Sequence, residues 1–404
     1  MTCLKSIRIL FVASLFVAFS HIAHAAPSHI FLTYSGAPES SVDINIILPR
    51  QVDGVFVYYD TADQGDVTEK YTFIVKAHYI PTPMELSDGR VMYVARITDL
   101  KPGTDYSFLV DEKKYGASSL RKFRTLPGCT APLRFVNGGD MGVADYIEPL
   151  LTLAAKTDPD FAVIGGDIAY VNGLLGGYAN WDSWLKNWDD MMVTTDGRMI
   201  PIVTAIGNHE TNRYATGDLA LNAPWYSSLF GRQGEHVYYS RHFGDNLILF
   251  SLDSGHTVPH DGAQAEWLAG EMKANAAVKY KFAAYHIPLY PAHRAYEGSG
   301  SAAGRAAWGG LFDEYGLTVG LEHHDHVLKR TKPLRGGEVV EQGTVFIGDG
   351  CFGRGAREID PQPRWYNAVE GSIPHFWVVN VRDSGLSFKA IDFEGITRDE
   401  FTLP

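Results

Sequence analysis

The stretch DFAVIGGDIAY, residues 160–170, joins an apolar run to two glycines and an aspartate. The run FAVI has the length and composition of a strand buried on both faces, and Gly-Gly-Asp then ends it. LRFVNGGDMG, residues 133–142, has the same pattern, and IEPLLTLAAK, residues 147–156, has helical spacing between the two. Apolar strands separated by helices predict an α/β domain with both faces of its sheet covered. We expect residues 129–404 to form this domain.

The pattern continues toward the C-terminus. The runs IPIVTAIG, NLILFSLDS, YKFAAYH and LTVGLE are typical of further strands, whereas WDSWLKNWDDMM (181–192) and AQAEWLAGEMKA (263–274) have the composition of helices. The sequence therefore predicts a mixture of strands and helices to the end of the chain.

The preceding segment, residues 26–128, contains short runs rich in Val, Ile, Tyr and Phe that are separated by turn residues. Such regular short strands predict an all-β sandwich of the fibronectin type III-like kind. LPGCTAP, residues 126–132, has the composition of a linker. The expected strands are SVDINIILP, GVFVYYD, YTFIVKAHYI (71–80), VMYVARI, DYSFLV and LRKFRTL.

The first 25 residues have the layout of a secretory signal peptide. Lys5 and Arg8 precede the apolar run ILFVASLFVAF, and Ala23-His24-Ala25 supplies small residues two apart, so cleavage is expected after Ala25. A membrane anchor is the alternative reading, but the run is shorter than the ~20 residues needed to span a bilayer. We therefore expect a secreted or periplasmic protein.

The composition excludes some partners. Hydrophobic residues make up 45% of the chain and charged residues 20%, which is typical of a globular protein. The net charge of −12 would become −14 on loss of Lys5 and Arg8, which argues against nucleic acid or an anionic membrane surface as partner. An anionic substrate would then need strong local positive charge. Cys129 and Cys351 would remain after cleavage and could pair in an oxidising compartment, which the sequence leaves open. Neither lies in a CxxC motif, so cysteine-based zinc or redox chemistry has little support.

Polar side chains follow the predicted strands at the points where ligands gather in open α/β sheets. Each of them alone is explained as a turn or a hydrogen-bonded polar residue. Their joint occurrence after five strands instead indicates a metal centre. The candidates are Asp140 after the first strand, Asp167 and Tyr170 after the second, Asn208 and His209 after the third, His286 after a later one, and His324 and His326 after the last.

This set of donors exceeds the needs of one ion, and two ions that share a carboxylate would use it fully. Tyr170 discriminates between metals, because a phenol has a pKa of about 10 and binds as phenolate only to a strong Lewis acid. Two carboxylates and a phenolate suit Fe(III). A shared carboxylate, an amide and two imidazoles suit a divalent ion such as Zn, Fe or Mn.

The ordered blocks GDMG, GDIAY, GNHE, AAYH and HHDH resemble the five-block signature of the purple acid phosphatases, within the calcineurin-like metallophosphoesterase superfamily. The resemblance implies a four-layer α/β/β/α catalytic domain after the N-terminal sandwich. His209 would face the substrate phosphate, and His293, matched only by approximate spacing, would protonate the leaving group. The ferric ligands implied are Asp140, Asp167, Tyr170 and His326, and the divalent ligands are Asn208, His286, His324 and the bridging Asp167.

The resemblance implies a secreted acid phosphatase that hydrolyses small phosphate monoesters by attack of a metal-bound hydroxide. Two alternatives stay open: a phosphodiesterase on the same scaffold, and an inactive secreted binding or adhesion module.

The chain departs from the family pattern at His323, where the family has glycine, so a tight turn would be strained or an extra donor supplied. Because His324 and His326 are two apart, we expect them on one side of an extended chain. His323 and Asp325 would then point away from the ions, either to support the ligands or as plain surface.

Overall fold

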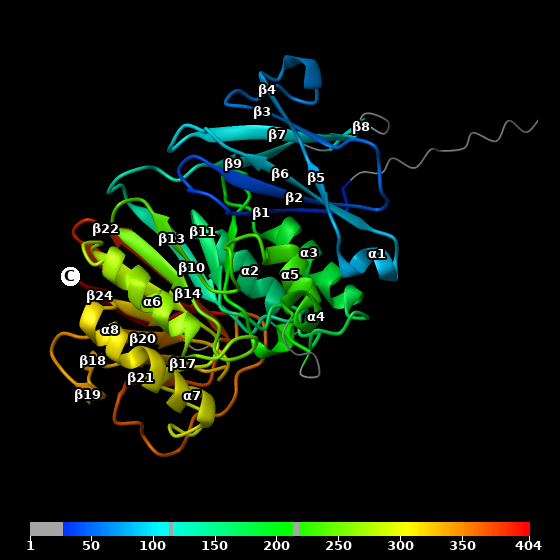
Figure 1. Cartoon of the computed structure of the whole chain (residues 1–404). Helices are drawn as coiled ribbons and strands as arrows, with labels where there is room; N and C mark the ends of the chain where they lie inside the picture. The colour runs from blue at the N-terminus through cyan, green and yellow to red at the C-terminus, as the bar shows by residue number, and fades with distance from the viewer. Residues whose placement is uncertain (1–26, 113–115, 119, 145, 213–217, 349) are drawn as a thin grey trace, which may run out of the picture.

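The computed structural model describes residues 27–112, 116–118, 120–144, 146–212, 218–348 and 350–404. The predicted signal peptide lies outside these residues. Two large β-sheets pack face to face, with helices on the outer side of each (Figure 1). No helix in the described residues is long and apolar enough to cross a membrane.

The first sheet has ten strands in the order β24-β23-β22-β10-β11-β12-β1-β2-β6-β5. Its centre is parallel, because β10 pairs with β11 and β11 with β12 in the same direction. The strands of this sheet that come from the α/β domain are β10 (Leu133–Gly138), β11 (Phe161–Ile164), β12 (Ile202–Thr204), β22 (His375–Arg382), β23 (Gly385–Asp392) and β24 (Thr397–Leu403).

The second sheet has seven strands in the order β13-β14-β15-β16-β20-β17-β21, and β14, β15, β16 and β20 run parallel. Its strands are β13 (Tyr239–Phe243), β14 (Leu247–Ser251), β15 (Tyr280–Ala284), β16 (Val319–Leu321), β17 (Leu328–Thr331), β20 (Val345–Gly348) and β21 (Asn367–Gly371). Smaller elements are β18 (Leu334–Arg335), β19 (Glu338–Val339), α4 (Leu219–Asn222) and α7 (Ser299–Gly304).

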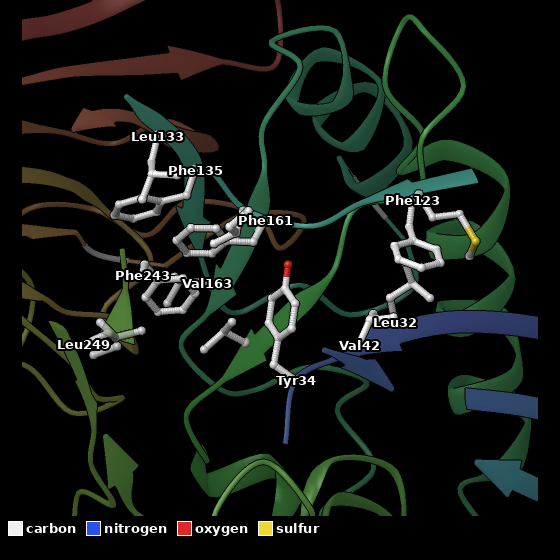
Figure 2. Packing of buried hydrophobic residues seen from close by; sticks show 14 of the residues in the cluster. Leu32, Tyr34, Val42, Phe123, Leu133, Phe135, Phe161, Val163, Phe243 and Leu249 are labelled. Atoms are coloured by element: carbon white, nitrogen blue, oxygen red, sulfur yellow. The ribbon is translucent and has the colours of Figure 1, made fainter. Parts of the chain in front are cut away.

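Aromatic rings fill the space between the two sheets. Phe161 of β11 stacks on Phe243 of β13 with ring centroids 4.1 Å apart, and Phe135 of β10 lies beside Phe161 at 5.0 Å (Figure 2). Each of these rings is at most 1% exposed. Burial of large apolar side chains from both sheets is the main force that holds the sheets together.

Helices cover the outer faces as the apolar spacing predicts. The predicted helices at 147–156, 181–192 and 263–274 are confirmed as α2 (Ile147–Ala155), α3 (Tyr178–Met191) and α6 (Ala263–Ala274). α2, α3 and α5 (Pro224–Phe230) pack on the first sheet, and α6 and α8 (Gly310–Tyr315) pack on the second. The predicted four-layer α/β/β/α architecture is therefore confirmed.

The N-terminal segment is a β-sandwich, as predicted, with a single short helix, α1 (Pro83–Ser87), and a 3-10 turn at Thr68–Lys70 among its described residues. The prediction of one strand over 71–80 is wrong. The chain changes sheets at the buried Ala77, whose N–H donates to the Val55 carbonyl at 2.8 Å. One layer holds β1 (His29–Thr33), β2 (Val42–Leu48), β5 (His78–Ile80) and β6 (Val91–Ile97), and the other holds β3 (Phe56–Asp60), β4 (Phe73–Lys76), β7 (Asp105–Glu112), β8 (Gly116–Ala117) and β9 (Arg121–Arg124).

The first sheet continues from the α/β part into the sandwich. β1 pairs in parallel with β12 through Thr33 and Ile202. Asp189 of α3 strengthens this junction, because its carboxylate accepts from the Ile30 N–H at 3.2 Å and lies 2.9 Å from the Arg121 guanidinium. The sandwich is therefore joined rigidly to the strands whose ends carry the candidate ligands.

Candidate metal centre

The predicted ligands all lie where strands of the two sheets end. Because parallel strands place their carboxyl ends at one edge, side chains far apart in the sequence meet there. Asp140 follows β10, Asp167 and Tyr170 follow β11, Asn208 opens a 3-10 turn after β12 (Asn208–Glu210), His286 follows β15, and His324 and His326 follow β16.

Three of these side chains form a first group. The Tyr170 hydroxyl donates to Asp140 Oδ1 at 2.9 Å, and His326 Nε2 lies 2.9 Å from that hydroxyl and 2.8 Å from Asp140 Oδ1. On its other side, His326 Nδ1 lies 3.3 Å from the carbonyl oxygen of Gly355. A carbonyl can only accept, so Nδ1 is the nitrogen that donates to Gly355 and Nε2 is the nitrogen that faces the group.

The other four form a second group around His286 Nε2. This nitrogen lies 3.1 Å from Asn208 Oδ1, 3.2 Å from Asp167 Oδ2 and 3.0 Å from His324 Nδ1. His286 Nδ1 donates to the carbonyl of Gly165 at 2.9 Å, so Nε2 is the nitrogen that faces the other three side chains. Two imidazole nitrogens, an amide oxygen and a carboxylate oxygen therefore converge at one point, and a carbonyl that holds Nδ1 is the usual support of a histidine ligand.

The electrostatics of the residues point the same way. Burial lowers the pKa of His286, but the carboxylates of Asp167 and Asp140 outweigh it and raise the pKa to about 10. Burial and the same two carboxylates raise the pKa of Tyr170 above its ordinary value. A phenolate at this position therefore requires a bound cation of high charge. The donor set of carboxylates, phenol, amide and imidazoles fits two metal ions.

Five of the candidate ligands have a backbone conformation that non-glycine residues rarely adopt. Their φ angles lie between 53° and 77°. Such conformations cost on the order of 1 kcal/mol or more each and gather at functional sites. The five are Asp140, Asp167, Tyr170, His324 and His326.

The expectation of an extended chain at His324–His326 is therefore wrong. The Asp325 N–H donates to the His323 carbonyl at 3.0 Å, which closes a tight three-residue turn around His324. The His324 N–H in turn donates to Asp140 Oδ2 at 2.7 Å. The turn, rather than strand alternation, directs the two imidazoles to different groups.

His323 is buried and supports the site from behind. A Cβ atom on Gly165 would lie 1.9 Å from His323 Nδ1, and one on Gly139 would lie 2.8 Å from its ring, so the ring fills the space that two Gly-Gly turns leave. Its Nδ1 donates to the Tyr285 carbonyl at 2.9 Å. His323 is not among the described residues with positive φ, so the predicted strain at this position is wrong.

Asp325 is also fully buried, and it holds the loop that carries His293. Its Oδ2 accepts from the backbone N–H groups of Ala292, His293 and Arg294 at 3.0, 2.8 and 3.2 Å. Its Oδ1 lies 2.5 Å from the Arg294 guanidinium. Of the two alternatives that the sequence left open for Asp325, plain surface is therefore wrong, and the hydrogen bonds agree with a supporting role.

His293 lies beside this turn, and its ring is directed toward another segment. Its Nδ1 donates to the Glu358 carbonyl at 2.7 Å, which leaves Nε2 available for another contact. The structure brings the backbone of His293 to the turn with the two histidines. It places the imidazole against the loop that follows β20 rather than within either group of ligands.

Replacing Asp325 by asparagine should lower the activity of the metal centre about 10–100-fold with metal content retained, as is typical for residues that orient a metal site. The amide would lose the ion pair with Arg294 and present an NH₂ group to backbone donors. Steady-state rates and metal analysis of the variant test this. Asp313→Asn is the matched control, because Asp313 is a partly exposed carboxylate of α8 that accepts from the Gly336 N–H at 2.8 Å. Wild-type activity in Asp325→Asn would contradict the supporting role.

His209 lies at the edge of the first group, as expected for a residue that faces a substrate. Its N–H donates to Asp167 Oδ1 at 2.7 Å, and its ring centroid lies 4.3 Å from that of Tyr170. Its Nδ1 contacts Asn172 Oδ1. The side chain is 30% exposed, so it can be reached from solvent.

Glu210 is a supporting residue that the sequence reasoning missed. Its buried carboxylate accepts from the N–H groups of Asp167 and Ile168, each at 2.7 Å, and of Gly207 at 2.9 Å. It thus ties the turn after β11 to the turn after β12. The available signal was the spacing of Gly207 and Glu210, which is that of a capping box.

A buried ion pair lies beneath the histidine turn. Glu322 and Lys329 are both fully buried, and Lys329 Nζ contacts Glu322 Oε2 and the Tyr290 carbonyl. Glu322 Oε1 accepts from the Tyr285 hydroxyl at 2.8 Å and the Leu289 N–H at 2.7 Å. The pair therefore joins the segment after β15 to the segment after β16.

Three arginines supply positive charge beside the ligands. Arg294 Nη1 and Arg357 Nη1 donate to the His324 carbonyl at 2.8 and 3.2 Å. The Arg354 guanidinium lies 4.7 Å above the ring of Tyr170, a distance suited to a cation–π contact. Because the net charge of the chain is negative, an anionic substrate would need positive charge near the site. The three arginines supply part of that charge.

Two further sequence features are resolved by the structure. Cys129 is exposed and Cys351 is buried, and both are free thiols. Arg330 of β17 pairs with Asp399 at 2.6 Å and lies over Phe401. Arg330 thus fastens β17 to the last strand of the first sheet.

The fold and the site define the class of the protein. Residues 133–328 match the family model of calcineurin-like phosphoesterases, and the chain belongs to that class. Residues 27–125 match the N-terminal domain of purple acid phosphatases, so the chain belongs to the purple acid phosphatase family within it.

Relatives and solved structures agree with this assignment. The chain is 27% identical over 281 residues to an uncharacterized protein of Mycobacterium tuberculosis, covering 60% of the chain and 51% of the relative. It is 26% identical over 302 residues to the protein named "Probable purple acid phosphatase 20" of Arabidopsis thaliana, covering 69% and 65%. The chain thus spans about half to two thirds of the length of these relatives.

In three dimensions the chain is similar to a purple acid phosphatase from yellow lupin seeds, with a TM-score of 0.79 at 16% identity, covering 94% of this chain and 74% of that one. It is also similar to PhoD, with a TM-score of 0.67 at 14% identity, covering 94% and 89%. At these identities the likeness concerns the fold.

Proposed function

We propose that the protein is an exported acid phosphatase with a dinuclear metal centre that hydrolyses phosphate monoesters. The observation that carries the proposal is the convergence of seven side chains into two groups of metal-binding atoms. Family membership supports the reaction class. Export rests on the predicted cleavage after Ala25.

The two groups would hold different ions. The first, Asp140, Tyr170 and His326, would hold Fe(III), because a phenolate suits a trivalent ion. The second, Asn208, His286 and His324, would hold Zn, Fe or Mn as a divalent ion, and Asp167 would be shared between the two. When bound, the ions would lower the pKa of water and offset the charge of the phosphate.

The remaining steps fall to the protein's own side chains. His209, exposed beside Tyr170 and Asp167, would donate a hydrogen bond to a phosphoryl oxygen. His293 Nδ1 donates to a carbonyl, so Nε2 is the atom at which a proton would be held for the leaving oxygen. The guanidinium groups of Arg294 and Arg357 would fix the histidine turn while these transfers occur.

The proposal is tested with the purified mature chain, residues 26–404. We expect a pair of metal ions per chain, a visible phenolate-to-iron absorption band, and faster turnover of p-nitrophenyl phosphate than of its bis-ester. Tyr170→Phe should remove the band because the phenolate oxygen is absent. A faster bis-ester rate would instead indicate a phosphodiesterase. Full metal content without turnover of either ester would indicate a binding module.

A further inference from the structure

A large cavity adjoins the candidate metal centre on the side of the second sheet. It has a volume of about 910 Å³ and is lined by the loop at 254–261 and by α7 with the π-helical turn that follows it at Arg305–Gly309. A smaller cavity of about 390 Å³ is lined by two of the candidate ligands, Asn208 and His324. Both cavities are lined by Gly255, His256 and Ile287. The two cavities therefore lie next to each other, with these three residues between them.

We propose that this larger cavity binds the ester group of the substrate and selects phosphate monoesters of apolar alcohols, such as alkyl-substituted phenols. The proposal rests on the proposed phosphatase function, because the phosphate would lie at the metal centre. Its ester oxygen would then point along the shared wall, and the carbon skeleton of the alcohol would enter the larger cavity.

The walls of the cavity are mostly apolar, with Ser254, Thr257 and Ser299 among the polar residues of the lining, and the helical side is made of small residues. Val258, Pro259 and Ile287 line one side, whereas Ala303 and Ala307 line the helical side. Small residues spaced by three and four lie on one face of the helix, and their size leaves the cavity open. Apolar walls favour an apolar occupant because its removal from water is the main source of binding free energy.

The charge of the lining excludes a second anionic group on the substrate. Among the lining residues, all of which the structure describes, Asp261 is the one with a formal charge, and no lysine or arginine is present. The arginines of the centre, Arg294, Arg354 and Arg357, line neither cavity. A nucleotide or a sugar bisphosphate would therefore place negative charge against a carboxylate and an apolar surface, at a cost in binding free energy.

A buried histidine forms part of the same wall. His260 lines the cavity and is 8% exposed. Its ring packs on Trp308 at 4.8 Å and against Gly255, where a Cβ atom would lie 2.9 Å from the ring. Burial lowers the pKa of His260, so the ring adds no positive charge that would attract a second anionic group.

The test compares two substrates with similar leaving groups. For the metal-loaded wild-type enzyme we expect kcat/KM for 4-butylphenyl phosphate to exceed that for phenyl phosphate by more than about tenfold, because each buried methylene contributes about fourfold. Ala303→Leu, which places a larger side chain in the cavity, should bring this ratio close to one. Ala302→Leu on the same helix, outside the lining, should leave both rates unchanged. A wild-type ratio near one, or an unchanged ratio in Ala303→Leu, would overturn the assignment.

A binding measurement separates this proposal from the proposed function. Calorimetry with 4-butylphenylphosphonate and phenylphosphonate needs no turnover. Tighter binding of the butyl compound to wild type, lost in Ala303→Leu, would support the cavity assignment even if no ester were hydrolysed. In that case the phosphatase function alone would fail. Equal affinities together with normal phosphatase activity would overturn the cavity assignment alone.

Discussion

Replacing Asp167 by asparagine should abolish metal loading of the centre and lower phosphatase activity by roughly a thousandfold or more, the scale of losing a main electrostatic stabiliser. Asp167 Oδ2 lies 3.2 Å from His286 Nε2, and its Oδ1 accepts from the His209 N–H at 2.7 Å. An amide has the same shape but no charge. The NH₂ group of the amide is a hydrogen-bond donor and would not bind a metal ion. Its single uncharged oxygen would not hold two cations as a carboxylate does.

The measurement is metal analysis of the purified variant together with its rate on p-nitrophenyl phosphate. Circular dichroism and thermal unfolding of the same sample check that the fold is retained. Asp190→Asn is the control, because Asp190 is an exposed residue of α3 that pairs with Lys186. The control should keep full activity, since surface ion pairs contribute little. Full metal content with normal activity in Asp167→Asn would rule out Asp167 as the bridge.

The sequence was sufficient to place the candidate ligands on the fold. Asp140 and Asp167 directly follow short apolar runs that end in Gly-Gly, and His286 follows the run YKFAAY. A strand of this kind in an α/β fold is parallel and buried, so the position of its carboxyl end follows from the pattern alone. The convergence of these side chains in the structure agrees with that expectation. Their binding of metal remains a prediction.

The backbone geometry of the site could not be read in the same way. The residue types at positions 324 and 326 do not indicate that His324 and His326 have left-handed φ angles, because the surrounding hydrogen bonds impose that conformation. The change of sheet at Ala77 was hidden for a similar reason, since its partner, Val55, lies in another segment. Propensity describes a residue and its sequence neighbours, whereas these features depend on distant partners.

Supporting residues were missed or left undecided because their partners are also distant. For Asp325 the sequence left a supporting role and plain surface open, and its carboxylate accepts from residues 292–294, which favours the supporting role. Glu322 ends a strand with a charge, which is the usual sign of an exposed strand end. Its burial follows from Lys329 and from the segment after β15. Only the folded chain shows that these charges are compensated.

The pair of Glu322 and Lys329 leads to the second large effect. Lys329→Met should lower the free energy of unfolding by about 3–5 kcal/mol, because it leaves the fully buried Glu322 carboxylate without its cation. Methionine has a similar volume, so the loss would come from charge rather than from a cavity. The tight turn around His324 begins at His323, the residue after Glu322. If the unpaired Glu322 carboxylate moved, it would displace this turn, and the affinity for metal would fall as well.

Urea denaturation of the wild type and the variant measures the change in the free energy of unfolding. Lys332→Met is the matched control, because Lys332 is exposed, and its effect should stay within about 0.5 kcal/mol. The double variant Glu322→Gln with Lys329→Met should recover a large part of the loss. Glutamine removes the unpaired charge and keeps an oxygen for the Tyr285 hydroxyl and the Leu289 N–H. A double variant as unstable as Lys329→Met would show that the uncompensated charge is not the cause, since that charge is absent from it.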